Sequence, residues 1–256
     1  MHRFYMPPEQ CGGPIFSLAE REAHHASQVL RARPGDQVTV LNGSGGEYLC
    51  EIVEVTKRSV KLRIKKETRH ESFPWQITLA QAIPKGKTFD TIVQKATELG
   101  AFRIIPLLTE RVVVHVDNET SESKVARWEQ NAIEAIKQCG SPWLPKINAP
   151  VSFAQALQAQ SASQLGFIAS LAPGSSHPRQ YFSEYAAQNQ PKLTQLSVWV
   201  GPEGDFTPAE LDAAQQAGLR PITLGPLVLR SDTAAIYCLS VLNYELQALF
   251  ASHSRV

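Results

Sequence analysis

Two loops in the C-terminal half carry residue types that could bind a ligand and act on it. The first, residues 200–206 (Val-Gly-Pro-Glu-Gly-Asp-Phe), follows a short apolar run, and the second, residues 223–235, separates another apolar run from a long amphipathic segment. Glycine lets backbone groups approach a ligand closely, and open α/β sheets bind ligands outside the carboxyl ends of their strands. Either loop alone could be an ordinary turn after a strand, but the pair at this spacing indicates a ligand site.

These loops need a framework, and from residue 75 onward the chain alternates apolar runs with amphipathic segments. Residues 89–99 place their apolar side chains on one helical face before Gly100, and Thr207 to Glu210 combines an N-cap, a proline in the first turn and a capping-box acid. The pattern predicts an α/β domain, a parallel sheet with helices on both faces. We expect strands at 75–83, 102–107, 165–171, 196–200 and 221–224, and helices at 89–99, 121–138, 207–217 and 232–250.

Several common site types lack their signatures. No glycine-rich phosphate loop and no Gly-x-Gly-x-x-Gly motif opens any of the expected helices, which argues against an ordinary nucleotide or dinucleotide site. The chain also has no Gly-x-Ser-x-Gly elbow, so an α/β hydrolase is excluded.

The first seventy residues have a different pattern, with short extended runs and tight turns. Strands are expected at 38–41, 47–55 and 59–65, with a strong turn signal at 42–46 (Asn-Gly-Ser-Gly-Gly) and an early helix near 19–30. A small unit of this kind predicts a β-barrel. Because residues 65–74 are polar, charged and closed by Pro74, we expect the linker to the second domain there.

The expected strand at 59–65 alternates apolar side chains with Lys61, Arg63 and Lys65, so it should bury one face and show three cations on the other. Seven Lys or Arg and one Glu lie between Lys57 and Arg69. Such a run is often just a solvated strand face. It could equally be a phosphate-contacting stripe, because cations on one rigid face release counterions from RNA together.

Composition sets outer limits. The chain has 256 residues, 43% of them hydrophobic, enough for one large domain or two modest ones with a real core. The formal net charge of +1 neither favours nor excludes a nucleic-acid partner, so any basic surface must be local. Four widely separated cysteines without metal-ligand spacing argue against zinc and a disulfide framework and favour a reducing cytoplasm. We expect no signal peptide, no membrane span and no metal.

Seven fragments in order resemble one family, the ribosomal RNA small subunit methyltransferase E family. They cover nearly the whole chain: Arg3-Phe4, Val29 to Arg31 with Gly35-Asp36, Lys85 to Lys87, Gln94 to Gly100, Pro106 with Thr109 to Arg111, and the two loops. The resemblance implies an S-adenosylmethionine-dependent enzyme that methylates N3 of uracil 1498 in 16S ribosomal RNA, within the 30S subunit. It also implies a homodimer, a PUA-like RNA-binding barrel at 1–70, and a SPOUT methyltransferase domain with a trefoil knot at 74–256.

The resemblance also implies site residues. The cofactor is expected against Leu171, Gly201, Pro202, Glu203, Gly204, Leu224, Gly225, Leu227, Leu229, Arg230, Thr233 and Ala234. Cations expected to hold RNA phosphates are Arg3, Arg31, Lys61, Arg63, Lys65, Lys85, Lys87 and Arg111, each of which could instead be a plain surface cation. Trp143, in a proline-flanked loop, could stack on a base.

Methylation at N3 of uracil requires loss of its proton, and the target must be unpaired or flipped out. We expect Arg230 to stabilise negative charge on the uracil oxygens, or else to pair with Asp232 and hold the loop. Glu203 or Asp232 is expected to accept the proton, although an acid before a helix often only caps amides.

The chain departs from the family pattern at four positions. Asp205 replaces a second glycine, Asp232 replaces glutamate, Lys137 stands where glutamate is common and Ser141 where arginine is common. Two other functions stay open at this stage. One is a different knotted methyltransferase, acting on a ribose 2′-oxygen or guanine N1, and the other is a non-catalytic RNA-binding protein of ribosome assembly.

Overall fold

The computed structural model describes residues 1–56, 58–112, 118–160, 163–188 and 192–253. It divides into two compact units. The smaller unit comprises Met1–Ser72 and Ala132–Leu144, and the larger comprises Phe73–Asn131 and Pro145–Val256. We expected one continuous N-terminal domain, but the smaller unit also takes in a segment from the middle of the chain.

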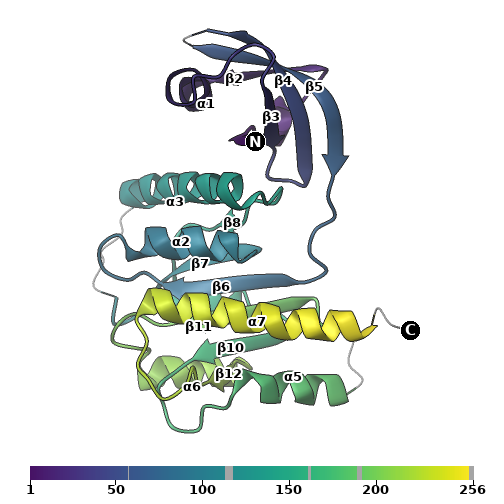
Figure 1. Ribbon diagram of the computed structural model, residues 1–256. Coiled ribbons are helices and arrows are strands. Elements are labelled where there is room, and N and C mark those ends of the chain that lie inside the picture. Colours follow the sequence, from purple (N-terminus) through teal and green to yellow (C-terminus); the bar gives the residue numbers. More distant parts are fainter. Residues whose placement is uncertain (57, 113–117, 161–162, 189–191, 254–256) are drawn as a thin grey trace. The chain divides into compact units, whose positions relative to one another are not determined.

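The smaller unit is built on a five-stranded sheet in the order β1-β3-β4-β5-β2 (Figure 1). Its strands are β1 (His2–Tyr5), β2 (Ile15–Ala19), β3 (Gln37–Leu41), β4 (Gly46–Val55) and β5 (Ser59–Arg69). Every pairing is antiparallel except β1 with β3. The expected early helix is present as α1 (Glu20–His24) followed by a π-turn (His25–Val29), and Arg31 leaves it at φ +52°.

Local chemistry explains the turn and the alternation of this sheet. The Asn42 side-chain oxygen accepts hydrogen bonds from the backbone N–H groups of Ser44 and Gly46, which closes the turn between β3 and β4. On β5, Val60 and Leu62 are fully buried, whereas the cations between and after them are exposed. The predicted one-faced strand is therefore confirmed.

The expected linker at 65–74 is partly wrong, because β5 continues to Arg69. The ten-residue β4 supplies backbone partners along this whole length, so that Gly46 pairs with Arg69. A bulge at Lys65 absorbs one extra residue of β5. The polar composition of 65–69 thus reflects a solvated strand end, not a chain break.

The larger unit contains a parallel sheet in the order β12-β10-β11-β6-β7-β8, with β9 also paired to β7, as predicted. The strands are β6 (Gln76–Ala82), β7 (Arg103–Leu108), β8 (Lys146–Ile147), β9 (Val151–Ser152), β10 (Leu165–Ala169), β11 (Gln195–Val200) and β12 (Arg220–Ile222).

Helices cover both faces of this sheet. Ile168 and Trp199 point into one apolar cluster with α4 (Phe153–Gln158) and α6 (Pro208–Gln216). Phe167, the neighbour of Ile168, points the other way and meets the ring of Phe182. That second face carries α5 (Pro178–Ala187), α7 (Ser231–His253), α2 (Thr88–Glu98) and the first part of α3 (Asn118–Cys139) (Figure 1).

The predicted helix ends are confirmed where capping signals were strongest. Thr207 and Glu210 form a reciprocal capping box at the start of α6, and Gly218 follows its end at φ +89°. Gly100, after α2, has φ +74°, a conformation that glycine adopts without strain.

Candidate active site

A cavity of about 500 Å³ opens at the carboxyl ends of β10, β11 and β12. Its walls are three loops of the larger unit: residues 169–175 after β10, residues 200–205 after β11, and residues 223–231 between β12 and α7. Small-molecule sites commonly have volumes of roughly 300–1,000 Å³. The two loops singled out from the sequence therefore converge on one cavity of suitable size.

The cavity contains most of the side chains expected around a cofactor. Leu171, Gly201, Pro202, Glu203, Leu224, Gly225, Leu227, Leu229 and Ala234 line it. Three expected residues, Gly204, Arg230 and Thr233, are not among the lining residues, although each directly follows or precedes one.

Sequence reasoning missed most of the loop after β10. We expected a strand up to Leu171, but β10 ends at Ala169, and the serines of the following loop bond to one another's backbone. Ser170 Oγ accepts from the Ala172 N–H at 3.0 Å, and Ser175 Oγ donates to the Ala172 carbonyl at 3.0 Å. The Pro-Gly pair at 173–174 was the available signal for a turn here.

A buried polar network underlies the cavity. Gln81, fully buried on β6, donates from Nε2 to Ser231 Oγ at 2.9 Å, and Ser231 Oγ donates to the Gly201 carbonyl at 3.1 Å. Gln81 Oε1 has no hydrogen-bond partner. Since a buried polar chain of this kind fixes the geometry of its members, the network ties the loop after β11 to the start of α7.

The acids and cations around the first loop are engaged with backbone groups. The Lys85 backbone N–H donates to Glu203 Oε1 at 3.3 Å, so the exposed Glu203 carboxylate already holds the segment after β6. The Arg111 guanidinium donates to the carbonyls of Gly204 and Phe206. Arg111 therefore clamps this loop, a role that we had not predicted for it.

Arg230 and Asp232 flank the start of α7 without pairing. The structure, which describes both residues fully, records no ion pair between them. Asp232 Oδ1 accepts from the Thr233 N–H at 2.9 Å, and the Arg230 side chain is exposed. The alternative in which Arg230 holds the loop through Asp232 is thus not supported.

The cations expected on β5 are largely neutralised by β4. Lys61 Nζ lies 2.6 Å from Glu54, and Lys65 forms an ion pair with Glu51. The hydrogen bond from Lys65, helped by its charge, lowers the pKa of the Glu51 carboxyl below its usual value. In the described part of the chain no ion pair is recorded for Arg63, which is exposed.

The remaining predicted phosphate contacts differ in how free they are. Arg3 donates to the carbonyls of Lys137 and Gln138 at 3.1 and 3.0 Å, so its guanidinium satisfies the C-terminal end of α3. The other three of the set, Arg31, Lys85 and Lys87, are exposed.

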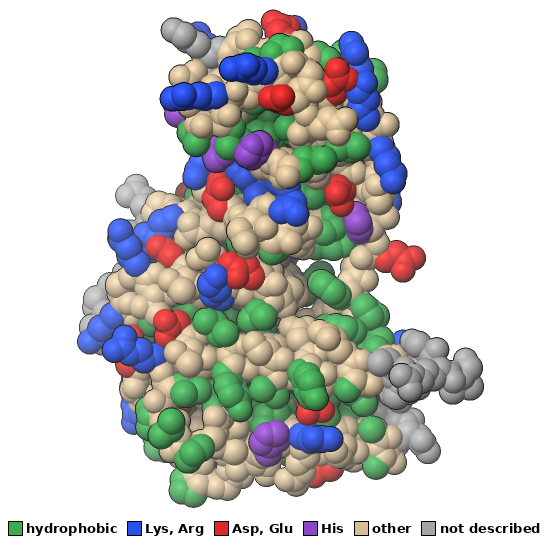
Figure 2. All heavy atoms as spheres, in the orientation of Figure 1, with side chains coloured by type: hydrophobic (Ala, Val, Ile, Leu, Met, Phe, Trp, Pro, Cys, Tyr) green, Lys and Arg blue, Asp and Glu red, His purple; other side chains and the backbone are tan. Residues whose placement is uncertain are grey.

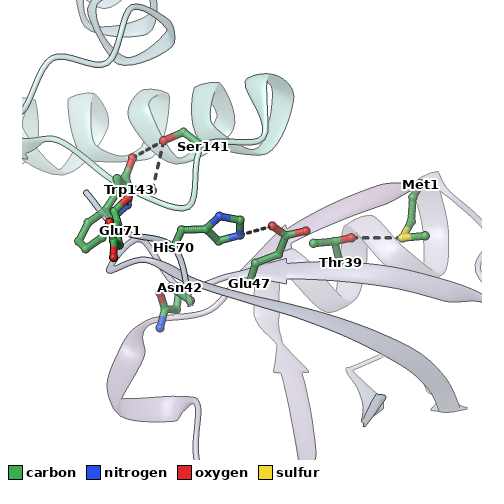
Figure 3. Close-up of polar contacts among 9 residues, drawn as sticks. Met1, Thr39, Asn42, Glu47, His70, Glu71, Ser141 and Trp143 are labelled. Atoms are coloured by element: carbon green, nitrogen blue, oxygen red, sulfur yellow. Dashed lines mark hydrogen bonds and ion pairs between the residues drawn. The ribbon is translucent and has the colours of Figure 1, made fainter. Parts of the chain in front are cut away.

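Trp143 and Ser141 are occupied within the smaller unit (Figure 3). Ser141 Oγ donates to the Trp143 carbonyl at 3.0 Å, and the indole N–H of Trp143 donates to the Glu71 carbonyl at 3.3 Å. A Cβ added at Gly45 would come within 2.5 Å of the Trp143 ring. Trp143 thus covers the turn between β3 and β4, which leaves no support for the idea that it stacks on a base.

Two further findings concern metals and membranes. Within the described ranges, no group of three or more His, Cys, Asp or Glu side chains is arranged to hold a metal ion. No described helix is both long and apolar enough to cross a membrane.

Comparison with known proteins agrees with this geometry. A family model described as an RNA methyltransferase domain matches residues 71–243, and one described as an RNA methyltransferase PUA domain matches residues 18–65. Ribosomal RNA small subunit methyltransferase E of Bacillus subtilis is 32% identical over 92% of each chain. The protein of that name from Synechocystis is 31% identical, covering 96% of this chain and 78% of its relative.

Solved structures extend the likeness to three dimensions. A methyltransferase from Legionella pneumophila, in complex with S-adenosylmethionine, has 34% identity and a TM-score of 0.84 over 96% of this chain and 97% of its own. A ribosomal RNA small subunit methyltransferase E from Neisseria gonorrhoeae, bound to S-adenosylmethionine, has 28% identity and a TM-score of 0.82 over 95% and 97%. The chain therefore belongs to the ribosomal RNA small subunit methyltransferase E family of RNA methyltransferases.

Proposed function

We propose that this protein transfers a methyl group from S-adenosylmethionine to N3 of a uridine, uracil 1498, in the 16S ribosomal RNA of the 30S subunit. The observation that carries the proposal is the cavity built by residues 200–205 and 223–231, in a chain of a family with solved members bound to S-adenosylmethionine. The base and position come from the family resemblance.

The residues present fit this cofactor. Gly201 lies so close to Asp205 and Phe206 that an added Cβ would sit 3.2–3.3 Å from their atoms, and Gly225 has φ +106°. Nothing in the described part of the chain accepts a hydrogen bond from the backbone N–H groups of residues 227–229. These amides, next to the exposed side chains of Leu227 and Val228, are suited to an adenine or a methionine carboxylate.

The chemistry divides between cofactor and protein. When bound, S-adenosylmethionine supplies a methyl group on a sulfonium, so that an N3–C bond forms as the S–C bond breaks, N3 gives up its proton and S-adenosylhomocysteine leaves. The protein positions the base and stabilises the charge that develops on it. Arg230, exposed beside the cavity, would stabilise the uracil oxygens, and Glu203 or Asp232 would take the proton.

We assign residues 1–70 to RNA binding and residues 74–256 to methyl transfer. Arg31 and Arg63 in the smaller unit, and Lys85 and Lys87 in the larger, are the exposed cations available for phosphates. The pairing of Lys61 and Lys65 with acids lowers their expected contribution, because a cation that already has a carboxylate partner gains less from a phosphate.

RNA binding is expected to weaken steeply with salt, with log affinity falling by about 0.7–0.9 per log unit of salt for each phosphate contact. Arg63→Ala should lower this slope by about one contact, whereas Lys61→Ala should change it less. Titrating labelled 30S subunits against each variant at several salt concentrations measures the slopes. A slope near zero for the unaltered protein would remove the basic surface from the proposal.

We further propose a cytoplasmic homodimer with a trefoil knot in the larger unit. Exposed apolar side chains support a dimer: Tyr237 and Tyr244 lie on one face of α7, and Leu227 and Val228 lie just before it. Figure 2 shows hydrophobic side chains on the face where Figure 1 draws α7. Because these residues adjoin the cavity loops, a partner bound there would help to enclose the site.

The test is to incubate the purified protein with labelled S-adenosylmethionine and 30S subunits that lack the modification, and then to identify the methylated nucleoside. Label in 3-methyluridine at one site is the expected result. Label in a 2′-O-methylated nucleoside or in 1-methylguanosine would keep the methyltransferase and overturn the substrate. No label, together with no binding of S-adenosylmethionine, would favour a non-catalytic RNA-binding protein.

A further inference from the structure

The cavity has an unusual charge balance for a site that would hold a zwitterionic ligand. Among the described residues that line it, only Glu203 and Asp205 are charged, and both are acidic. The lining contains no Lys, Arg or His side chain. The nearest cation along the chain, Arg230, is exposed and outside the lining, so solvent screens its charge.

Asp205 is the better fixed of the two acids. Its Oδ2 accepts from the Leu171 N–H at 3.1 Å and its Oδ1 accepts from the Phe206 N–H at 2.8 Å. Both donors are neutral, and the described structure records no cation paired with Asp205. The carboxylate thus keeps its full charge in a set position, half-buried at the cavity wall.

The backbone at Asp205 explains why an acid can stand at this position. Its φ is +59°, the left-handed region that glycine occupies freely and that Asp and Asn tolerate better than other residues. The family pattern has glycine here, which offers the same backbone conformation without a carboxylate. This chain therefore adds a negative charge to the cavity without changing the path of the loop.

We propose that Asp205 is a specificity-determining residue that makes the cavity prefer S-adenosylmethionine over S-adenosylhomocysteine. The inference rests on the proposed function, which places the cofactor in this cavity. Both molecules carry an ammonium and a carboxylate, but only S-adenosylmethionine has the positive sulfonium. A fixed carboxylate in a cavity without a compensating cation attracts the charged molecule and gains nothing comparable with the neutral thioether. The product would then leave more readily than in a cavity that has glycine at this position.

The experiment is calorimetric titration of the full-length protein with each of the two molecules, without RNA and without turnover. Asp205→Asn keeps the size, the left-handed backbone and one acceptor oxygen while removing the charge. We expect the affinity ratio of S-adenosylmethionine to S-adenosylhomocysteine to fall by about tenfold, which corresponds to about 1.4 kcal/mol. Asp212→Asn removes an equal charge from the exposed side of α6, outside the cavity lining, and should leave the ratio unchanged.

Each other outcome has a distinct meaning. An equal loss of affinity for both molecules in Asp205→Asn would show that Asp205 only links Leu171 to the neighbouring loop, and would overturn the charge proposal. An unchanged ratio would overturn it as well. If Asp205→Asn does not fold, as judged by circular dichroism, Asp205→Gly, the family's residue, takes its place with the same expected fall. If the unaltered protein binds neither molecule, the proposed function fails first and this inference with it.

Discussion

Replacement of Arg230 by alanine is expected to lower kcat for methyl transfer by about 10²–10³-fold, the loss typical when one electrostatic stabiliser is removed from an active site. The side chain is exposed beside the cavity and has no recorded ion pair with Asp232, so its charge is available to the uracil oxygens. Because Arg230 does not line the cavity, calorimetry should show the affinity for S-adenosylmethionine nearly unchanged.

The control is Arg179→Ala, which removes an exposed arginine from α5 in the same unit and should leave kcat close to that of the unaltered protein. Arg230→Lys should recover part of the lost rate, since a lysine supplies charge without the planar guanidinium. Single-turnover rates at saturating cofactor and 30S subunits measure the effect. Full turnover by Arg230→Ala would rule out a catalytic role for this arginine.

Much of the larger unit was predictable because its signals are local. Periodic apolar positions buried Phe89, Ile92 and Val93 on α2, and the capping residues Thr207 and Glu210 located the start of α6. The two glycine-containing loops were found as a ligand site because both leave the carboxyl ends of strands. Their convergence on one cavity follows from the parallel sheet, which brings those ends to the same edge.

The parts that sequence reasoning missed depend on contacts between distant residues. Gln81 lies 150 positions from Ser231, and the two side chains meet only because β6 runs beneath the start of α7. The pairing of Lys61 with Glu54 likewise needed the register of β4 against β5, which a count of charges along one strand does not contain. Asp205 was noted as a departure from the family, but its bond to Leu171 joins two loops whose proximity only the fold supplies.

The second large effect concerns the core that supports the cavity. Trp199→Ala is expected to destabilise the larger unit by about 3–5 kcal/mol, because it removes a large buried side chain and leaves a cavity behind. Trp199 is 1% exposed and packs edge-on against Phe153 at a ring separation of 5.3 Å. It lies on β11, two positions before Gly201, so loss of this core also removes support from the loop that lines the site.

Trp199→Phe separates the contribution of packing from that of the polar indole nitrogen. Trp199 Nε1 is buried without a hydrogen-bond partner, so losing it relieves a penalty that offsets part of the smaller ring's lost contact. We expect Trp199→Phe to remain within about 1.5 kcal/mol of the unaltered protein. Urea unfolding followed by far-ultraviolet circular dichroism tests both variants, with lower midpoints at an unchanged m value as the expected pattern. If Trp199→Phe proved as unstable as Trp199→Ala, the indole N–H would have to be making a stabilising interaction, contrary to its unpartnered position.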